Sequence, residues 1–406
     1  MFEKYFALRT KFMRASEIRE LLKVIEKRRI ISLAGGFPDP HTFPIEDFYD
    51  ITDAVLKDYG THALQYSVTR GVSYFRHKLI DFAYKMRGIK VKDLEYILVL
   101  SGSQQGLDII ARTLINPGDY VVVELPTYLA ALNAFNLSAP NYIGIPMDDY
   151  GMRVDILEDR LRELYSEGKR VKLVYTVPIA HNPAGVTMSY DRRKYLIELA
   201  SQYDFLVVED DPYSYLVFEN VDVTPLKALD KEDRVIYLST FSKILAPGLR
   251  LGWLIAHPEL TDIFERCKQS LDLHTPTFSQ YIAAEAIKRG IVDKVIAKAK
   301  AIYKRKRDAM LDALVDFFPK NAWWSKPIGG MFVFARLPWN LDTKALLPEA
   351  IEKGVAYVPG QSFFVDGSGK NTLRLNFSYP SVKEIRSGIE ILGKFFREKA
   401  KELGLA

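Results

Sequence analysis

Residues 235–243 read VIYLSTFSK, so an apolar run of four residues ends on a group of hydroxyls and a lysine. A further run, GWLIA, follows at 252–256, and similar runs lie upstream at 96–100, 120–124, 171–176 and 205–209. Most are rich in Val, Ile, Leu and Tyr with little polar alternation, which is typical of strands buried on both faces. Because helical stretches separate these runs, residues 90–260 are predicted to form a mainly parallel sheet covered by helices.

The pattern of apolar and charged residues changes after about residue 290. A long charged helix leads to residues 330–337, GMFVFARL, which alternate more like an antiparallel strand. We therefore expect a smaller α+β domain in residues 294–406. Residues 16–29 read as an amphipathic helix, because apolar residues recur there with the 3.6-residue period. This N-terminal helix is expected to pack with the smaller domain.

Composition bounds the class of protein. The chain has 406 residues, enough for two or three domains or for one large and one small domain. Its net charge of +5 is too small a surplus to indicate nucleic acid, and charges interrupt the N-terminus too early for a signal peptide. No uncharged apolar run reaches the roughly 18 residues of a membrane-spanning helix. The single cysteine, Cys267, fits a reducing compartment, so a cytoplasmic protein without membrane contact is expected.

In open α/β sheets, ligands bind beyond the carboxyl ends of the strands, so the residues after each run matter most. After the run at 96–100 comes SGSQQGL, residues 101–107, which opens a helix to about Leu114. Small residues at a helix start leave backbone N–H groups free and suit an anion such as phosphate. A plain serine cap with a glycine turn is the structural alternative.

Three carboxylates, Glu209, Asp210 and Asp211, follow the apolar residues 205–208. Such neighbours repel one another and raise their own pKa values, so a compensating cation is expected. A metal ion is one answer, but the six histidines show no ligand spacing, so no metal site is expected. A cationic organic cofactor is another answer, and a solvated loop is the structural alternative.

Lys243 lies at the end of the run at 235–238, between hydroxyls and apolar residues. Arg250 follows, and hydroxyls with an arginine suit a phosphate group. A lysine in a confined, cation-rich pocket loses pKa and becomes a nucleophilic amine. Taken alone, such a lysine is far more often a surface charge than a functional amine. Together, the three strand ends favour a phosphate cradle, an acid facing a cationic ring and an amine that forms a Schiff base.

These segments resemble those of a known family. From residues 32–38, SLAGGFP, to 374–377, RLNF, the chain is similar to fold-type I pyridoxal-phosphate enzymes of the class I/II aminotransferases. Residues 239–252, NPAG at 182–185 and DDPY at 210–213 carry the likeness. It is strongest to the subgroup of 2-aminoadipate, kynurenine and archaeal aromatic aminotransferases. The cofactor implied is pyridoxal 5′-phosphate.

The resemblance also implies the domain organisation. The α/β fold would comprise a large domain over residues 48–293, with a mainly parallel seven-stranded sheet sandwiched by helices. A smaller α+β domain would form from the N- and C-terminal segments, residues 1–47 and 294–406. A homodimer is implied as well, because this family completes each active site with a residue from the neighbouring subunit.

Cofactor contacts can be carried over by motif. Lys243 resembles the Schiff-base lysine, and Asp210 resembles the acid that keeps the pyridine nitrogen protonated. Asn182 and Tyr213 resemble the partners of the ring oxygen, and Tyr128 resembles the ring that stacks on the cofactor. The phosphate cradle would comprise Ser103, Gln104, Ser242, Arg250 and Thr240, the last where the family usually has serine. Lys243, Asp210 and Tyr128 are the expected catalytic residues.

Contacts to the substrate and the neighbouring subunit follow in the same way. Arg374 resembles the arginine that clamps the substrate carboxylate, assisted by Asn182, and Gly36 belongs to the loop that closes over the substrate. Tyr66 resembles the tyrosine that reaches the neighbouring subunit's phosphate. Arg19 matches in position an arginine that meets acidic side chains in 2-aminoadipate enzymes. Packing, turn formation, backbone geometry and a solvated charge are the respective alternatives for the tyrosines, Asn182, Gly36 and Arg19.

The implied activity is transfer of an amino group from an aromatic, 2-aminoadipate or broad-range donor to 2-oxoglutarate by a ping-pong mechanism. Lys243 would carry the proton between the substrate and the cofactor. A β-lyase or decarboxylase on the same scaffold would keep the same lysine and aspartate. Some transcription regulators carry an aminotransferase-like domain behind a DNA-binding winged helix. About thirty residues precede Ser32, which we expect to be too few for that module.

Overall fold

The computed structural model describes residues 1–13, 21 and 30–405. Its largest sheet has the spatial order β2-β9-β8-β7-β6-β3-β4-β5. The bounds of these strands are β2 (Ile97–Leu100), β3 (Tyr120–Leu125), β4 (Asn141–Asp148), β5 (Gly151–Met152), β6 (Val171–Thr176), β7 (Leu206–Asp210), β8 (Val235–Thr240) and β9 (Gly252–Ile255).

Strands β4, β3, β6, β7 and β8 run parallel to one another, whereas β9 lies antiparallel between β2 and β8. The predicted mainly parallel sheet is therefore confirmed, with two-residue β5 as an additional antiparallel edge strand. Every residue of β2, β8 and β9 is buried, as the continuous apolar runs indicated. Strand β4 has mostly half-buried residues, and its lower apolar content explains why the sequence did not single it out.

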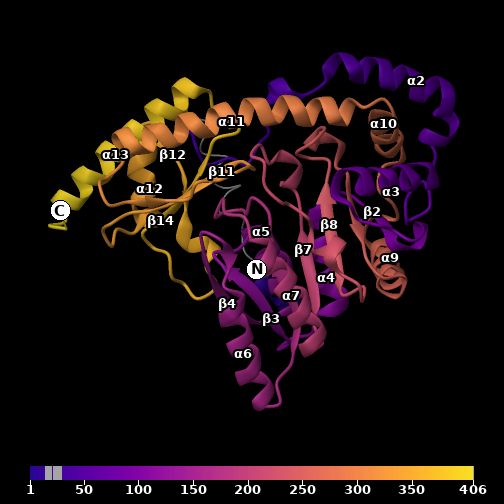
Figure 1. The fold of residues 1–406 in the computed structure, drawn as a ribbon, viewed down its shortest axis with the longest axis horizontal. Helices are drawn as coiled ribbons and strands as arrows, with labels where there is room; N and C mark the ends of the chain where they lie inside the picture. The colour runs from indigo at the N-terminus through magenta and orange to yellow at the C-terminus, as the bar shows by residue number, and fades with distance from the viewer. Residues whose placement is uncertain (14–20, 22–29, 406) are drawn as a thin grey trace.

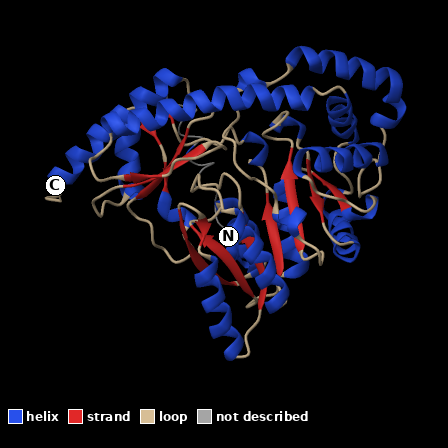
Figure 2. Cartoon of the chain, viewed as in Figure 1, coloured by secondary structure: helices blue, strands red, loops and turns tan. Residues whose placement is uncertain are grey.

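Helices flank this sheet (Figure 2). The described α-helices, including those beside the smaller sheet, are α2 (Ile45–Ala63), α3 (Ser73–Arg87), α4 (Ser103–Leu114), α5 (Leu129–Phe135), α6 (Val154–Ser166), α7 (Tyr190–Tyr203), α8 (Leu226–Leu229), α9 (Pro258–Asp272), α10 (Thr277–Lys288), α11 (Ile291–Phe317), α12 (Thr343–Glu352) and α13 (Val382–Glu402). Helix α4 ends at Leu114, as predicted, and begins within the predicted segment 101–107. Because β2 leads directly into α4, the start of this helix lies at the carboxyl end of its strand.

A second, four-stranded antiparallel sheet has the order β10-β11-β14-β13. Its strands are β10 (Trp323–Trp324), β11 (Phe332–Arg336), β13 (Val358–Pro359) and β14 (Thr372–Asn376). The antiparallel strand predicted within 330–337 is thus confirmed. The 27-residue helix α11 runs from α10 beside the large sheet to α13 beside the small one (Figure 1).

The N-terminal segment joins the C-terminal part through a short parallel sheet. Strand β1 (Ile31–Ser32) pairs with β12 (Val355–Ala356). The smaller α+β unit is therefore built from both ends of the chain, as expected, although the exact domain boundaries stay a prediction. Of the predicted helix at 16–29, all but Leu21 lies outside the described residues; Leu21 is buried in an apolar cluster with Phe334 and Phe363.

Candidate functional site

The start of α4 and Arg250 together form a cationic corner at the end of β2. A Cβ atom added to Gly102 would lie 2.5 Å from Arg250 Nη2, and Gly102 has a φ of +85°. Only glycine suits both that approach and that backbone conformation. Ser103 is the first residue of α4, whose free N–H groups favour an anion. The structure therefore brings together two parts of the predicted phosphate cradle.

Two hydroxyls from the end of β8 lie beside each other. Thr240 Oγ1 lies 3.0 Å from Ser242 Oγ, and the Ser242 N–H donates to Thr240 Oγ1 at 3.1 Å. Gln104, by contrast, is exposed and donates from its side chain to the Ala130 carbonyl oxygen at 3.0 Å. That bond ties α4 to α5, so the side chain of Gln104 has a structural contact in this state.

Three consecutive carboxylates lie at the end of β7, and two of them have their own partners. Glu209 accepts two backbone N–H groups from α8, each at 2.8 Å. Asp211 accepts from the hydroxyls of Ser214 and Tyr237 at 2.6 and 2.8 Å, and Arg87 lies 3.4 Å away. Burial and the neighbouring Asp211 raise the pKa of Glu209 to about 8. Only the middle carboxylate is left to face a cofactor.

Asp210 is that carboxylate, and it is 2% exposed. Its Oδ2 accepts from the Tyr175 hydroxyl at 2.9 Å, whereas its buried Oδ1 has no hydrogen-bond partner among the described residues. Burial raises the pKa of Asp210 to about 7, an effect that Tyr175 opposes and Asp211 reinforces. A buried acceptor without a donor is costly, so Oδ1 is suited to an N–H donor that carries positive charge.

Lys243 follows β8 by three residues, and its Nζ donates to the Gly36 carbonyl oxygen at 2.8 Å. Burial, together with the positive charges of Arg374 and Arg250, lowers the pKa of Lys243 to about 8. A substantial fraction of this amine is therefore neutral near pH 8 and is able to act as a base or nucleophile. The contact with Gly36 brings the predicted substrate-covering loop against the predicted catalytic lysine.

Asn182, Tyr213 and Arg374 form a connected group. Arg374 Nη1 donates to Asn182 Oδ1 at 2.8 Å, and Asn182 Nδ2 donates to the Tyr213 hydroxyl at 3.3 Å. Asn182 and Tyr213 are 4% and 5% exposed, respectively. Burial raises the pKa of Tyr213, and the nearby Tyr128 adds to the effect. Tyr128, the residue before α5, thus belongs to the same group.

The guanidinium of Arg374 is held in an aromatic setting. It is 2% exposed and lies 4.2 Å from the centre of the Phe332 ring and 5.4 Å from that of Phe363. Its Nη2 donates to the Ala34 carbonyl oxygen at 2.8 Å, while its buried Nε lacks a hydrogen-bond partner within the described ranges. Burial lowers the pKa of Arg374 to about 10. A buried cation with an unused donor is suited to a carboxylate.

Among the described residues, Tyr66 is a predicted site residue that is not brought into this group. Tyr66 is 78% exposed, and its ring packs edge-on against His274 with 5.7 Å between centroids. That exposure leaves its expected role towards a neighbouring subunit a prediction. Arg19 lies outside the described residues, so its expected role also stays a prediction.

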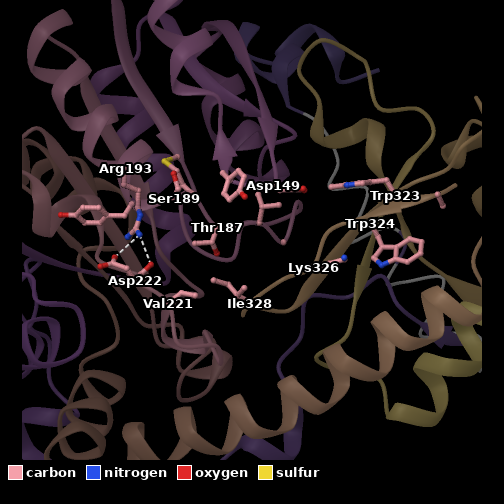
Figure 3. A pocket seen from close by; sticks show the side chains of 16 residues that line it. Asp149, Thr187, Ser189, Arg193, Val221, Asp222, Trp323, Trp324, Lys326 and Ile328 are labelled. Carbon is pink, nitrogen blue, oxygen red and sulfur yellow. Dashed lines mark hydrogen bonds and ion pairs between the residues drawn. The ribbon is translucent and has the colours of Figure 1, made fainter.

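A separate crevice of about 700 Å³ lies between the segment after α11 and the loop that follows Asn182 (Figure 3). Trp323, Trp324 and Lys326 line one side and Arg193 the other, where Arg193 donates to Asp222. The lining includes Gly185 but none of the predicted site residues among those described. The crevice is therefore lined in part by residues that follow Asn182 in the chain, and it is separate from the group around Lys243.

Comparison with known proteins identifies the family. The family model described as aminotransferase class I and II matches residues 43–392. The chain belongs to the class I and II aminotransferases. It is 52% identical over 401 residues to aromatic-amino-acid aminotransferase 1 of Thermococcus litoralis, which covers 99% of this chain and 96% of that protein. It is 37% identical over 385 residues to 2-aminoadipate transaminase of Thermus thermophilus, covering 94% of each.

A solved structure agrees with this membership. Kynurenine aminotransferase from Pyrococcus horikoshii, solved in complex with PMP, superimposes with a TM-score of 0.95 at 52% identity, covering 98% of each chain. The chain is accordingly a transaminase that transfers amino groups between amino and oxo acids, and its cofactor is pyridoxal 5′-phosphate. Within the described residues, no helix is both long and apolar enough to cross a membrane.

The residues present fit this cofactor. Asp210 offers an unpaired buried oxygen for a protonated ring nitrogen, and Lys243 offers an amine whose pKa is lowered to about 8. The close approach of Arg250 to Gly102 provides a cation beside a helix start, which suits a phosphate. These three features correspond to the ring, the aldehyde and the phosphate of one molecule.

Two residues of this aminotransferase site were missed at the level of sequence. Tyr175 lies in β6, paired with Val208 of β7, and reaches Asp210 only because of that register. A tyrosine in a mostly buried strand needs an acceptor for its hydroxyl, and this was the available signal. Phe332 opens β11 and supports Arg374 from a strand far away in sequence. Sequence patterns offered no signal for that contact.

Proposed function

We propose that this aminotransferase uses aromatic or broad-range amino donors, including 2-aminoadipate, with 2-oxoglutarate as the acceptor. The observation that carries the proposal is the buried Arg374 guanidinium lying on the ring of Phe332, with Phe363 near by. A substrate carboxylate bound there would bring its side chain into an aromatic environment. The activities for which the relatives from Thermococcus litoralis and Pyrococcus horikoshii are named support the same class of donor.

The cofactor-binding roles that we propose follow the geometry around Lys243. Asp210 would accept from the ring nitrogen, Asn182 and Tyr213 would contact the ring oxygen, and Tyr128 would stack on the ring. The phosphate would be held by Ser103, Gln104, Thr240, Ser242, Arg250 and the neighbouring subunit's copy of Tyr66. The unpaired Asp210 oxygen and the cationic corner beside Gly102 support this arrangement.

When bound, pyridoxal phosphate supplies an electron sink for the negative charge that develops on the substrate Cα atom. Lys243 removes the proton from Cα and later returns one, because its lowered pKa permits both steps near neutral pH. Asp210 stays ionised against the positive ring, which favours that electron withdrawal. Ping-pong kinetics follow, because the donor's oxo acid leaves before the acceptor binds.

Arg374 orients the substrate in this scheme. A bidentate contact with the α-carboxylate would use the unpaired Nε and a neighbouring guanidinium N–H, while Nη1 keeps its bond to Asn182. Gly36, whose carbonyl oxygen accepts from Lys243, would cover the substrate from the loop before α2. Water is then excluded from the reacting atoms, which strengthens every charge interaction in the site.

A panel of amino donors assayed with and without 2-oxoglutarate tests the proposal. We expect oxo-acid formation to depend on the acceptor and to be fastest with aromatic donors. Product formation without an acceptor would instead indicate a β-lyase or decarboxylase. A strict preference for glutamate and 2-aminoadipate would contradict the aromatic preference and would favour a role for Arg19 in reading acidic side chains. Arg19→Ala would then raise KM for acidic donors and spare aromatic ones.

Three further features stay predictions. A homodimer is expected, with Tyr66 serving the neighbouring site. The domain boundaries at residues 47/48 and 293/294 are expected from the family resemblance. A cytoplasmic location is expected from the cysteine content.

A further inference from the structure

A buried carboxylate that the proposed mechanism does not use lies at the end of β3. Glu124 is 0% exposed and is the fifth residue of that strand. Its Oε1 accepts from the Thr176 hydroxyl at 2.7 Å, and its Oε2 accepts from the Val177 backbone N–H at 3.1 Å. The third contact is with His181 Nε2 at 2.9 Å. Glu124 therefore binds three groups on the segment that leads from β6 to Asn182.

The protonation of the His181 ring follows from its two contacts. The Ala184 N–H donates to His181 Nδ1 at 3.1 Å, so Nδ1 must be the unprotonated nitrogen. Nε2 therefore carries the proton and donates it to Glu124. The ring is 1% exposed and neutral in this arrangement. A doubly protonated ring would lose the bond from Ala184.

These contacts hold the loop that presents Asn182. The ring of His181 accepts from Ala184, while the His181 backbone donates to the Val186 carbonyl oxygen at 2.8 Å. Its own carbonyl oxygen accepts from the Gly185 N–H at 2.6 Å. Residues 181–186 thus form a compact turn closed around His181. Glu124 fixes that turn from the neighbouring strand.

The amide of Asn182 has only one useful orientation. Its oxygen accepts from Arg374 and its nitrogen donates to Tyr213, so a rotated or displaced amide would lose both contacts. The Tyr213 hydroxyl and Arg374 are proposed to meet the cofactor and the substrate, respectively. The position of the turn at His181 therefore bears on both binding events.

We propose that Glu124 and His181 are a positioning pair, which sets the affinity for substrate carboxylates by fixing Asn182 between Arg374 and Tyr213. The inference rests on the proposed function, since it assigns Arg374 to the substrate. The same pair joins the ends of β3 and β6, from which Tyr128 and Asn182 extend. A purely structural pair would stabilise the fold without altering substrate binding, and the variants below separate the two roles.

The chain offers a conservative variant and two disruptive ones. In Glu124→Gln, the amide oxygen can accept from Val177 and His181, and the amide nitrogen can donate to Thr176, because a hydroxyl both donates and accepts. Glu124→Leu removes all three contacts at similar volume. His181→Phe keeps a ring but removes the bonds to Glu124 and Ala184. Two disruptive variants at different positions keep the test decisive if one of them fails to fold.

Glu285→Leu provides the matched control. Glu285 is 2% exposed and accepts hydrogen bonds from Tyr74, Lys288 and Arg289, away from the site around Lys243. Its loss should lower the melting temperature to a degree similar to that of Glu124→Leu. A shift in substrate affinity that is absent from this control cannot be attributed to destabilisation alone.

The experiment measures KM and kcat for phenylalanine and 2-oxoglutarate, the Kd of the apoprotein for pyridoxal phosphate, and the pH midpoint of the holoenzyme's visible absorbance. We expect Glu124→Leu and His181→Phe to raise both KM values by about ten-fold or more, because small displacements of binding groups have large effects. The pH midpoint and the Kd for the cofactor should shift as well. Glu124→Gln should stay within about two-fold of wild type for each quantity.

Wild-type KM, Kd and pH midpoint in a folded Glu124→Leu or His181→Phe enzyme would overturn the inference, even if the melting temperature fell. Equal changes in KM, Kd and pH midpoint in Glu124→Gln and Glu124→Leu would show that the hydrogen bonds of Glu124 do not position Asn182. Failure of the proposed function gives a different result, in which the wild-type enzyme itself shows no acceptor-dependent amino transfer.

Discussion

Asp210 and Lys243 link the protonation of single residues to cofactor binding. Burial raises the pKa of Asp210 from 3.8 to about 7, so the ligand-free fold loses stability as the pH rises between these values. The sign follows because the folded state holds this proton more tightly than the unfolded state does. Burial lowers the pKa of Lys243 from 10.5 to about 8, so its neutral form becomes common as the pH approaches 8.

We predict that the affinity of the apoprotein for pyridoxal phosphate rises as the pH increases from about 6 to 8. A charged Asp210 and a neutral Lys243 both favour the bound cofactor, and both forms become more abundant over this range. Asp210→Asn should bind more weakly and should lose the part of the rise that lies near pH 7. Fluorescence titrations of both apoproteins measure this, and superimposable pH profiles would count against the assignment.

Helix α11 holds the loop that carries Gly36. Lys306 Nζ lies 2.6 Å from Asp39 Oδ2 and donates to the Ser378 carbonyl oxygen at 2.8 Å. The Asp39 N–H donates to the Tyr303 hydroxyl at 2.9 Å. Burial opposes ionisation of Asp39, but Lys306 and His41 outweigh it, and the pKa of Asp39 is lowered. One helix therefore anchors the segment that would cover the substrate.

We predict that Lys306→Met lowers the free energy of unfolding by about 3 kcal/mol, because it leaves a buried carboxylate without its main partner. The KM for amino donors should also rise, because the loop that carries Gly36 is no longer held by α11 in this variant. Lys304→Met is the control, since Lys304 is exposed on the same helix and its loss should cost about 1 kcal/mol or less. Urea denaturation and steady-state kinetics measure both effects, and equal losses in the two variants would refute the anchor.

Sequence patterns predicted the buried strands well because burial on both faces leaves a continuous apolar signal. They did not reveal that β9 lies antiparallel between β2 and β8, since the direction of a fully buried strand leaves no trace in its composition. Strand β4 was missed because its residues are mostly half-buried and include polar ones. The register of neighbouring strands could not be predicted either. The contact between Tyr175 and Asp210 depends on the register of β6 and β7, so it was not predicted.

Across the whole molecule, the residues at strand ends were the ones that sequence patterns could single out. Lys243 and Asp210 fall into this class, whereas Asn182 was assigned from the family resemblance. Contacts between distant segments were not predictable, as with Phe332 beneath Arg374 or Glu124 beside His181. These residues act through packing and hydrogen bonds that only the assembled chain creates.

The exposed Tyr66 allows a test of the expected dimer. We predict that Tyr66→Ala and Lys243→Ala homodimers are both impaired, whereas a hybrid of the two regains activity. One site of the hybrid would combine an intact Lys243 with an intact Tyr66 of the partner subunit. If Tyr66 instead served its own subunit, the hybrid would contain no complete site and activity would stay low. Mixing the two proteins after reversible dissociation, with unmixed variants as controls, distinguishes these outcomes.

We infer that Lys243 binds the cofactor covalently and carries the proton. Mass spectrometry after borohydride reduction of the holoenzyme, combined with a transamination assay, tests it most directly. Wild type and Lys231→Ala, which changes an exposed lysine, should gain the mass of one reduced cofactor and turn over donor and acceptor. Lys243→Ala should gain no such mass and should lose turnover. Retention of both the covalent label and the activity by Lys243→Ala would show that another residue binds the cofactor and carries the proton.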